Sequence, residues 1–312
     1  MNIFTNIVVL LVSLWAVIKS AEYAVKYSSK LAQGLKLPKH VVGFLLVAMI
    51  SALPEMLISV DSAFKGEPAL GLGTLFGSNI IDLTLVFSLV VIISRRSINV
   101  QSKFIDTSFN YLVLLTLPII FGLNGYYSRL EGALLVISGL GYYYSLLRKE
   151  KIFDSGVERK ISWKHLILFI ASIIILLITA NITATYGLNV AHGININPTV
   201  IGIFIIALGV ALPELVFSIQ AAKEDHDGMA IGDILGNVLT DATIVIGTVA
   251  LICPFEFNKR IVYITGVFML ISAIILLYLM RTGKALARRE SWILIIIYML
   301  FVLVELGIFQ LF

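Results

Sequence analysis

The sequence predicts an all-α polytopic membrane protein with about ten transmembrane helices in two inverted-topology five-helix repeats. Three observations predict this fold: the composition, a ladder of apolar runs and an internal duplication. Of the 312 residues, 59% are hydrophobic and 13% are charged, which is too apolar for an ordinary soluble protein. The formal net charge is +4, but the basic residues lie in short loops between apolar runs. This distribution indicates a role in membrane topology and does not favour nucleic-acid binding.

Ten apolar runs have about the 17–25 residues that a helix needs to cross the hydrocarbon core of a bilayer. The hydrophilic stretch 148–162 separates five runs from five. We therefore divide the chain into a first repeat (1–147), a cytoplasmic linker (148–162) and a second repeat (163–312). The first run has neither a charged leading segment nor a small-residue cleavage site, so we expect a membrane span there and not a signal peptide. The runs fall at about 3–25, 40–64, 69–93, 108–124, 129–147, 163–186, 198–222, 228–253, 260–280 and 291–311.

Lysine and arginine residues are distributed unequally between alternate loops. The loops on one side of the membrane carry 18 of them, and the loops on the other side carry 4. The positive-inside rule places the richer side in the cytoplasm and both termini outside it. Because each repeat has an odd number of spans, the second repeat must cross the membrane in the opposite sense to the first. The short loops and the lack of a targeting segment are typical of a prokaryotic plasma-membrane protein.

A motif that contains a proline and two acids occurs twice. Each copy has a Leu-Pro-Glu sequence in one span and a Gly-x-x-x-x-Asp sequence in the next, within the ranges 42–91 and 201–250. Glu55 corresponds to Glu214 and Asp82 to Asp241, in both cases 159 residues apart. A gapless overlay at this spacing also matches Ser59 with Ser218. The chain therefore contains an internal duplication, and each copy carries two carboxylates.

All four acids lie near the middle of their predicted spans. An acidic side chain at this depth costs about 2.5–3.5 kcal/mol, so such residues usually face the bundle interior and mark an ion or proton path. Two carboxylates about 6 Å apart repel by roughly 3 kcal/mol at an effective dielectric constant of 20. A pocket that gathers all four must therefore hold cations, or protons bound to the carboxyl groups. With no histidine or cysteine nearby, the oxygen ligands favour hard ions such as Ca²⁺, Mg²⁺, Na⁺ or H⁺.

The two prolines predict a helix break one turn before each glutamate. Pro54 cannot donate a hydrogen bond to the carbonyl of Ile50, and Pro213 cannot donate one to the carbonyl of Gly209. Free carbonyls in a membrane are tolerated only where they line a cavity or meet a ligand. The carbonyls of Ile50 and Gly209 are therefore candidate cation ligands. The glycine pairs that precede the aspartates, at 73 and 77 and at 232 and 236, are more typical of close helix packing.

These residues resemble the cation/Ca²⁺ exchanger superfamily, and most closely its Na⁺/Ca²⁺ exchanger branch. Members of that family have ten helices in two inverted repeats, each with a Gly-Thr-Ser-x-Pro-Glu motif and a Gly-Ser-x-x-x-Asn/Asp motif. The resemblance implies a secondary antiporter of Ca²⁺ against Na⁺ or H⁺, with Glu55 and Glu214 as central divalent ligands and Asp82 and Asp241 beside them. It also implies that the first and sixth spans slide against the remainder to switch access. Inorganic cations and lipid would be the partners, with no cofactor, nucleic acid or obligatory protein partner.

The motifs also depart from the family pattern. Three of the four hydroxyl groups before the Pro-Glu pairs are missing, and Ser51 is the hydroxyl that remains. Ser78 keeps the serine of the first Gly-Ser, whereas Asn237 replaces it in the second copy. Asp82 and Asp233 stand where asparagine is common. We add Ser51, Ser78 and Asn237 to the candidate ligands, and both Na⁺ and H⁺ remain open as counter-ions, as does another divalent ion in place of Ca²⁺.

A channel and an enzyme are the competing functions, and further acids lie outside the duplicated motif. A cation channel could use the same acids, although paired helix breaks in inverted repeats favour alternating access. Nothing in the sequence indicates an enzyme, since it has no recognisable hydrolase, metalloprotease or phosphate-binding motif. Asp233 is expected to be a water-facing acid at the inner end of its span, or a step on an inner ion path. The run Glu224-Asp225-His226-Asp227 is expected to be a plain solvated turn, with a cation-gathering role as the alternative.

Overall fold

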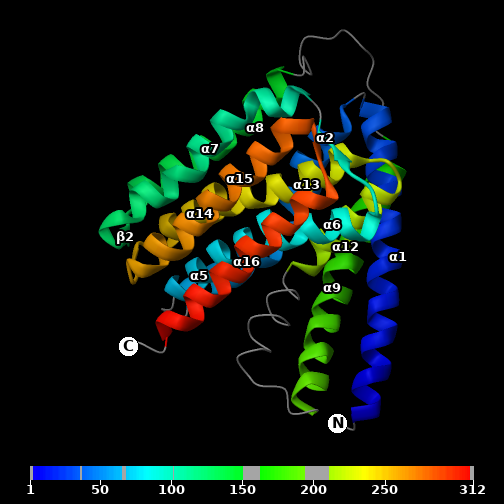
Figure 1. Cartoon of the computed structure of the whole chain (residues 1–312), viewed down its shortest axis with the longest axis horizontal. Helices are drawn as coiled ribbons and strands as arrows, with labels where there is room; N and C mark the ends of the chain where they lie inside the picture. The colour runs from blue at the N-terminus through cyan, green and yellow to red at the C-terminus, as the bar shows by residue number, and fades with distance from the viewer. Residues whose placement is uncertain are drawn as a thin grey trace.

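The computed structural model describes residues 3–35, 37–64, 68–100, 102–149, 162–193 and 211–309. This part of the chain is mostly helical, as predicted (Figure 1). In the first half the helices are α1 (Ile3–Leu35), α2 (Lys39–Val42), η1 (Gly43–Val47), α3 (Ala48–Ser51), α4 (Leu53–Phe64), α5 (Pro68–Ile81), η2 (Asp82–Val86), α6 (Phe87–Ser94), α7 (Ser102–Phe121), η3 (Gly122–Asn124) and α8 (Arg129–Lys149). In the second half they are α9 (Trp163–Gly193), α12 (Leu212–Lys223), α13 (Asp227–Thr240), η5 (Asp241–Val245), α14 (Ile246–Ile252), η6 (Ile261–Gly266), α15 (Val267–Gly283) and α16 (Arg288–Phe309).

Six helices in the described ranges are long and apolar enough to cross a membrane. Two shorter apolar helices, Lys39–Ser51 and Ser108–Asn124, accompany them. The chain is therefore a multi-pass membrane protein. The six are Phe4–Leu35, Gly71–Ser94, Arg129–Arg148, Trp163–Thr183, Asp227–Ile252 and Ile261–Gly283.

The duplication seen in the sequence is repeated in local structure. The bounds of α4, α5 and η2 return 159 residues later as those of α12, α13 and η5. Both η2 and η5 are single π-helical turns, and each begins at the duplicated aspartate, Asp82 or Asp241. Such turns occur inside α-helices and are frequent at functional sites. The predicted run 198–222 lies within the described residues only from Ala211 onward.

The two halves of the chain interlock. Helix α8 of the first half packs on α14 of the second, and α16 of the second half packs on α6 of the first. A Cβ atom placed on Gly132 would lie 2.7 Å from the carbonyl oxygen of Gly247, so the backbones of α8 and α14 touch. The hydroxyl of Ser88 in α6 donates to the carbonyl of Ser291 in α16 over 2.9 Å. Each half therefore completes its packing with helices of the other.

Two short antiparallel ladders also join the halves. Strand β1 (Ile98–Asn99) pairs with β4 (Ala285–Leu286), and β2 (Tyr126–Tyr127) pairs with β3 (Phe255–Glu256). Strand β2 lies at the far left tip of the slab of tilted helices in Figure 1. Each ladder thus ties a loop of the first half to a loop of the second.

Helices α1 and α9 form a separate layer beside this slab (Figure 1). They run antiparallel, because Thr183 donates to the hydroxyl of Ser13 over 2.9 Å and the ring of His165 stacks on that of Tyr27 with centroids 6.2 Å apart. The helices have 33 and 31 residues, so at about 1.5 Å per residue each is longer than a hydrocarbon core of about 30 Å. The predicted first run, 3–25, therefore ends well before its helix does.

Candidate functional site

The predicted helix break is present in the first copy of the motif. Helix α3 ends at Ser51, and α4 begins at Leu53 after the single residue Ala52. Ala52 still donates to the carbonyl of Ala48 over 3.0 Å, and Met56 donates to Ala52 over 3.0 Å. The interruption is thus one residue wide, just before the proline that lacks an N–H group. Ile50 is half-buried on α3.

In the second copy, α12 begins at Leu212 and has Pro213 in its first turn. Proline is well tolerated there, because its missing N–H would have no partner within the helix. Ala211, just before the helix, accepts a hydrogen bond from Leu215 over 3.0 Å. The candidate ligand Gly209 lies outside the described residues.

All four duplicated acids are buried. The exposed fraction is 2% for Glu55, 1% for Glu214, 1% for Asp82 and 0% for Asp241. Glu55 and Glu214 lie in the first turns of α4 and α12, where the positive end of the helix dipole stabilises negative charge. The duplicated sequence therefore places the two glutamates at helix starts and the two aspartates on π turns.

The acids of the two halves lie close enough to interact electrostatically. Glu214 interacts with Glu55 and Asp82, and Asp241 also interacts with both of these residues. Carboxylates from α4, η2, α12 and η5 thus lie near one another in one buried region. Their mutual repulsion makes this region unfavourable unless it holds positive charge.

Several oxygens at this region have no hydrogen-bond partner in the part of the chain that the structure describes. These are both carboxyl oxygens of Glu214 and of Asp241, Oε2 of Glu55, Oδ1 of Asp82 and Oδ1 of Asn237. Buried polar atoms are nearly always satisfied, and an exception calls for a water or an ion. Among the described residues, no three Asp, Glu, His or Cys side chains are placed to hold a metal ion by themselves. A bound cation would therefore also need amide, hydroxyl or main-chain oxygens.

The candidate neutral ligands lie around the acids. Asn237 is 1% exposed, and its side-chain amide donates to Oδ2 of Asp82 over 3.1 Å. Ser78 donates to the carbonyl of Leu75 over 3.1 Å, which leaves its oxygen lone pairs available. Asn237 lies one turn before Asp241 on the same face of the helix. The amide thus links a carboxylate of the first half to the helix that carries a carboxylate of the second.

Asp233 is more deeply buried than expected. It is 0% exposed, so the expectation of a water-facing acid at the inner end of the span is wrong. Ser51 donates to its Oδ1 over 3.3 Å, and Ser218 donates to its Oδ2 over 3.2 Å. The four-residue spacing of Asp233, Asn237 and Asp241 on one helix face could have placed it with the other acids. The overlay of the two copies, which matches Ser59 with Ser218, likewise marked Ser218 as a residue of the duplicated motif.

Glycines bring α13 against the helix of residues 39–51. A Cβ atom on Gly236 would lie 2.6 Å from Cβ of Ala48, and one on Gly232 would collide with the carbonyl oxygen of His40. A Cβ atom on Gly43 would lie 2.5 Å from the carbonyl oxygen of Met229. The packing interpretation is therefore confirmed for the glycines at 232 and 236, and this close approach brings Asp233 to Ser51. It is wrong for Gly73 and Gly77, where an added Cβ atom would meet nothing within 4 Å in the described part of the chain.

Comparison with known proteins identifies the family. Residues 5–146 and 164–307 match the sodium/calcium exchanger protein family. The chain belongs to this family. The exchanger is 23% identical to the sodium/calcium exchanger MaX1 of Methanosarcina acetivorans, over 97% of this chain and 99% of that protein. It is 27% identical to the putative antiporter CaxA of Alkalimonas amylolytica, over 78% of this chain and 80% of that one.

The fold of the exchanger is also that of a solved relative. The sodium-calcium exchanger NCX_Mj superposes with a TM-score of 0.82, at 22% identity, over 96% of this chain and 98% of that chain. At this identity the superposition supports the fold alone. The inner membrane protein YrbG of Escherichia coli is 24% identical over 80% of each chain.

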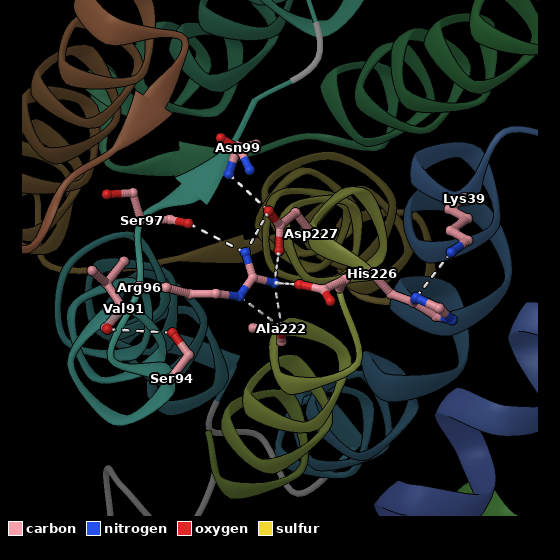
Figure 2. A network of polar contacts seen from close by, with 10 residues as sticks. Lys39, Val91, Ser94, Arg96, Ser97, Asn99, Ala222, His226 and Asp227 are labelled. Carbon is pink, nitrogen blue, oxygen red and sulfur yellow. Dashed lines mark hydrogen bonds and ion pairs between the residues drawn. The ribbon is translucent and has the colours of Figure 1, made fainter.

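A polar network anchors the start of α13 in the exchanger (Figure 2). Arg96 donates to both carboxylate oxygens of Asp227, over 3.0 Å from Nη1 and 2.5 Å from Nη2. The main-chain N–H of Asn99 adds a bond of 2.8 Å, and the hydrogen bond to Asp227 raises the pKa of the Arg96 guanidinium above its ordinary value. The expectation of a plain solvated turn holds for Asp225, whose side chain is 87% exposed, but is wrong for Asp227, whose side chain is 11% exposed.

The neighbouring histidine joins the same turn to α1 and α2. Nδ1 of His226 lies 2.9 Å from Nζ of Lys39, and its Nε2 lies 2.9 Å from Oγ of Ser29. The ammonium group can only donate, so Nδ1 accepts and Nε2–H donates to the serine. The turn between α12 and α13 and the first residue of α13 therefore contact α1, α2 and the end of β1.

Proposed function

We propose that this exchanger is a secondary active antiporter that moves Ca²⁺ in exchange for Na⁺ or H⁺ around a mid-membrane carboxylate site. One observation carries the proposal: buried carboxylates from both halves lie near one another, and several of their oxygens have no hydrogen-bond partner among the described residues. Membership of the sodium/calcium exchanger family and the name of MaX1 support the same function. The first alternative function is exchange of another divalent cation against H⁺, and the second is a cation channel.

Glu55 and Glu214 are proposed as the central divalent ligands, with Asp82 and Asp241 beside them. One divalent ion leaves two of the four carboxylate charges uncompensated, so protons or further cations accompany it. The remaining candidate ligands are the side chains of Ser51, Ser78 and Asn237 and the carbonyls of Ile50 and Gly209. The shortage of hydroxyl groups favours H⁺ as the counter-ion, whereas the family favours Na⁺.

The proposed topology has ten helices in two inverted repeats, with both termini outside the cytoplasm. The two ladders support it, because each joins loops that the charge distribution assigns to the same side. Strands β1 and β4 belong to loops rich in lysine and arginine, and β2 and β3 belong to loops that are poor in them. The contact of Lys39 with His226 and that of Arg96 with Asp227 likewise join loops of the predicted cytoplasmic side.

Alternating access is proposed to result from sliding of α1 and α9 against the other helices. Helix α1 packs on α12, and it contributes the small buried side chains Ala21, Ala24 and Ala32 to an apolar cluster. The same cluster contains Phe217 and Ala221 of α12. Small side chains make a shallow relief, so the two helices can shift without large steric barriers. A shift of this pair would uncover the carboxylate region to one side at a time.

The proposal is tested by ion flux in sealed proteoliposomes. An imposed Na⁺ or pH gradient should drive Ca²⁺ uphill, whereas a channel would only dissipate the Ca²⁺ gradient. Glu55→Gln and Glu214→Gln should each lower the initial rate by about tenfold or more, as expected when a ligand that holds the ion is impaired. Glu224→Gln removes an acid at the exposed turn and is the matched control. Wild-type rates in both site variants would refute the site.

A further inference from the structure

A cavity lies on the seam between α1 and α9, apart from the buried acids. Its volume is about 370 Å³, within the range of about 300–1,000 Å³ that is typical of small-molecule sites. In the described part of the chain, every residue that lines it belongs to one of these two helices. The cavity, called the seam cavity below, is thus a feature of the pair that forms a separate layer beside the slab in Figure 1.

Small side chains open the seam cavity between the helices. On α1 they are Ala16 and Ser20, one turn apart, and on α9 they are Ala171 and Ser172. The hydroxyl of Ser20 donates to the carbonyl of Ala16 over 2.8 Å. The hydroxyl of Ser172 donates to the carbonyl of Phe169 over 2.7 Å. Because both hydroxyls are satisfied within their own helices, these walls suit an apolar ligand.

The seam cavity faces the membrane. In the apolar stretches of α1 and α9, 28% and 29% of the residues are buried, compared with 72% in Gly71–Ser94 and 83% in Asp227–Ile252. Trp15 and Ile175 line the cavity and are 64% and 51% exposed. Exposed apolar surface at this depth of a membrane protein contacts lipid tails. An acyl chain is therefore the apolar ligand that is available to the cavity.

The cavity has about the length of one leaflet. It extends along α1 from Trp15 to Tyr27, which is about 18 Å at about 1.5 Å per residue. Half of a hydrocarbon core of about 30 Å is about 15 Å. Trp15 lies near the middle of the predicted run 3–25, and Tyr27 lies just beyond its end, on the predicted cytoplasmic side. One lipid of the cytoplasmic leaflet would thus fill the cavity and place its headgroup at Tyr27.

The end of the cavity at Tyr27 is basic. Nζ of Lys30 lies 5.8 Å from the centre of the Tyr27 ring, and the ring of His165 stacks on the same tyrosine. Lys26 lies one turn before Lys30 on the same face of α1, and Lys164 precedes His165 at the start of α9. These three lysines are exposed, and no ion pair within the described ranges involves them.

The charge at this end favours an anion. Lys19 also lines the cavity, and its ammonium donates to Glu22 over 2.8 Å. This pair is neutral, so the uncompensated charge comes from Lys26, Lys30 and Lys164. Basic pockets between membrane helices on the cytoplasmic side typically bind anionic headgroups. The cavity therefore suits an anionic phospholipid better than a zwitterionic one.

We propose that the seam cavity binds one anionic phospholipid, with an acyl chain between α1 and α9 and the phosphate at Lys26 and Lys30. The site is separate from the carboxylate region, so the proposal does not depend on which ions are transported. Toward both ends of the cavity the helices contact each other directly, through the hydroxyls of Ser13 and Thr183 and through the ring stack at Tyr27. The lipid would join the helices between these contacts and strengthen their association as one unit.

Native mass spectrometry of the purified exchanger tests the headgroup site. The probes are palmitoyl-oleoyl phosphatidylglycerol and palmitoyl-oleoyl phosphatidylcholine, which have the same chains and differ in net charge. We expect the wild type to bind one phosphatidylglycerol at least about tenfold more tightly than phosphatidylcholine. A lysine near an anionic headgroup contributes about fivefold in affinity, so the double variant Lys26→Gln, Lys30→Gln should bind phosphatidylglycerol about 25-fold more weakly. Lys223→Gln removes an exposed charge at the end of α12 and is the matched control.

A second pair of variants tests the apolar part of the cavity. Ala171→Phe places a ring in the space between the helices and should reduce the binding of both lipids to background. Ile174→Phe places the same side chain on α9 outside the residues that line the cavity, at a position that is 48% exposed. It should bind both lipids as the wild type does.

Each outcome bears on the proposal. Equal binding of the two lipids by the wild type would show ordinary contact with the bilayer and would overturn the site. An equal loss of phosphatidylglycerol in Lys223→Gln, or an equal loss of both lipids in Ile174→Phe, would place the lipid elsewhere and would also overturn it. Loss of headgroup preference in the lysine variant, with normal binding in both controls, supports it. The lysine variant changes only exposed positions, so it decides the matter if Ala171→Phe does not elute as a folded, monodisperse protein.

Discussion

Arg96 and Asp227 form an ion pair near the surface of the molecule, and their contributions to the free energy of unfolding should be coupled. Asp227 is the first residue of α13, the helix that also carries Asp233, Asn237 and Asp241. We consider Asp227→Asn, Arg96→Gln and the double variant. Asparagine retains the size of aspartate, so Asp227→Asn mainly removes charge. Glutamine is shorter than arginine and has two N–H donors in place of five, so Arg96→Gln removes the paired hydrogen bonds together with the charge.

The expected magnitude follows from the burial of the pair. Removing one partner of a fully buried ion pair costs about 3–5 kcal/mol, whereas exposed pairs contribute about 0.2–1 kcal/mol. The side chains of Asp227 and Arg96 are 11% and 29% exposed, so the pair lies between these limits. We expect Asp227→Asn to cost about 2 kcal/mol and the coupling between the two changes to be of similar size.

Thermal unfolding in detergent measures this effect. A loss of about 2 kcal/mol corresponds to a fall in Tm of about 3 °C for a chain of this length. Asp225→Asn is the matched control, because the Asp225 side chain is 87% exposed and makes one 3.2 Å contact with the same arginine. It should cost less than about 0.5 kcal/mol. Strict additivity of Asp227→Asn and Arg96→Gln, within about 0.5 kcal/mol, would show that the pair does not anchor α13.

Two further predictions concern the central region. Gly236→Val should lower Tm and transport, since its Cβ atom would lie 2.6 Å from Cβ of Ala48 and overpacking costs about 1–3 kcal/mol. Gly141→Ala on α8, where a Cβ atom meets nothing within 4 Å in the described part, should retain both. Asp82→Asn should raise Tm in chelator by removing one of the repelling carboxylates, and should reduce the rise in Tm that saturating Ca²⁺ produces. An unchanged Tm in chelator would argue against repulsion in the empty site.

The duplicated motif explains why much of the architecture could be predicted from sequence. The spacing of 159 residues recurs in the bounds of three consecutive helical elements, because the same local sequence makes the same helix starts and the same π turn. Burial of the acids also followed from their depth in apolar runs, since an exposed charge in hydrocarbon is costly. These inferences depend only on local sequence and on the apolar interior of the membrane.

Features that depend on tertiary contacts were not predictable in the same way. Asp233 is held by Ser51, which is 182 residues away in the chain, and Asp227 is held by Arg96, which is 131 residues away. An acid near the end of an apolar run looks the same in sequence whether water or a distant side chain satisfies it. The extension of α1 to Leu35 was missed for a related reason, because residues beyond the hydrocarbon need not be apolar to remain helical.

The proposed sliding of α1 makes opposite predictions for two cross-links, built without the native Cys253. Ser29 and His226 connect α1 to the turn before α13 across 2.9 Å, so cysteines at these positions joined by a short thiol reagent should stop transport until reductant is added. Cysteines at Ser13 and Thr183, whose hydroxyls are 2.9 Å apart, would join α1 to α9 and should leave transport intact, because the two helices move together. Transport that survives the first link would show that α1 does not shift against the helices that carry the acids. Transport that fails with the second would show that α1 and α9 move relative to one another, and access would then have to change by a different motion.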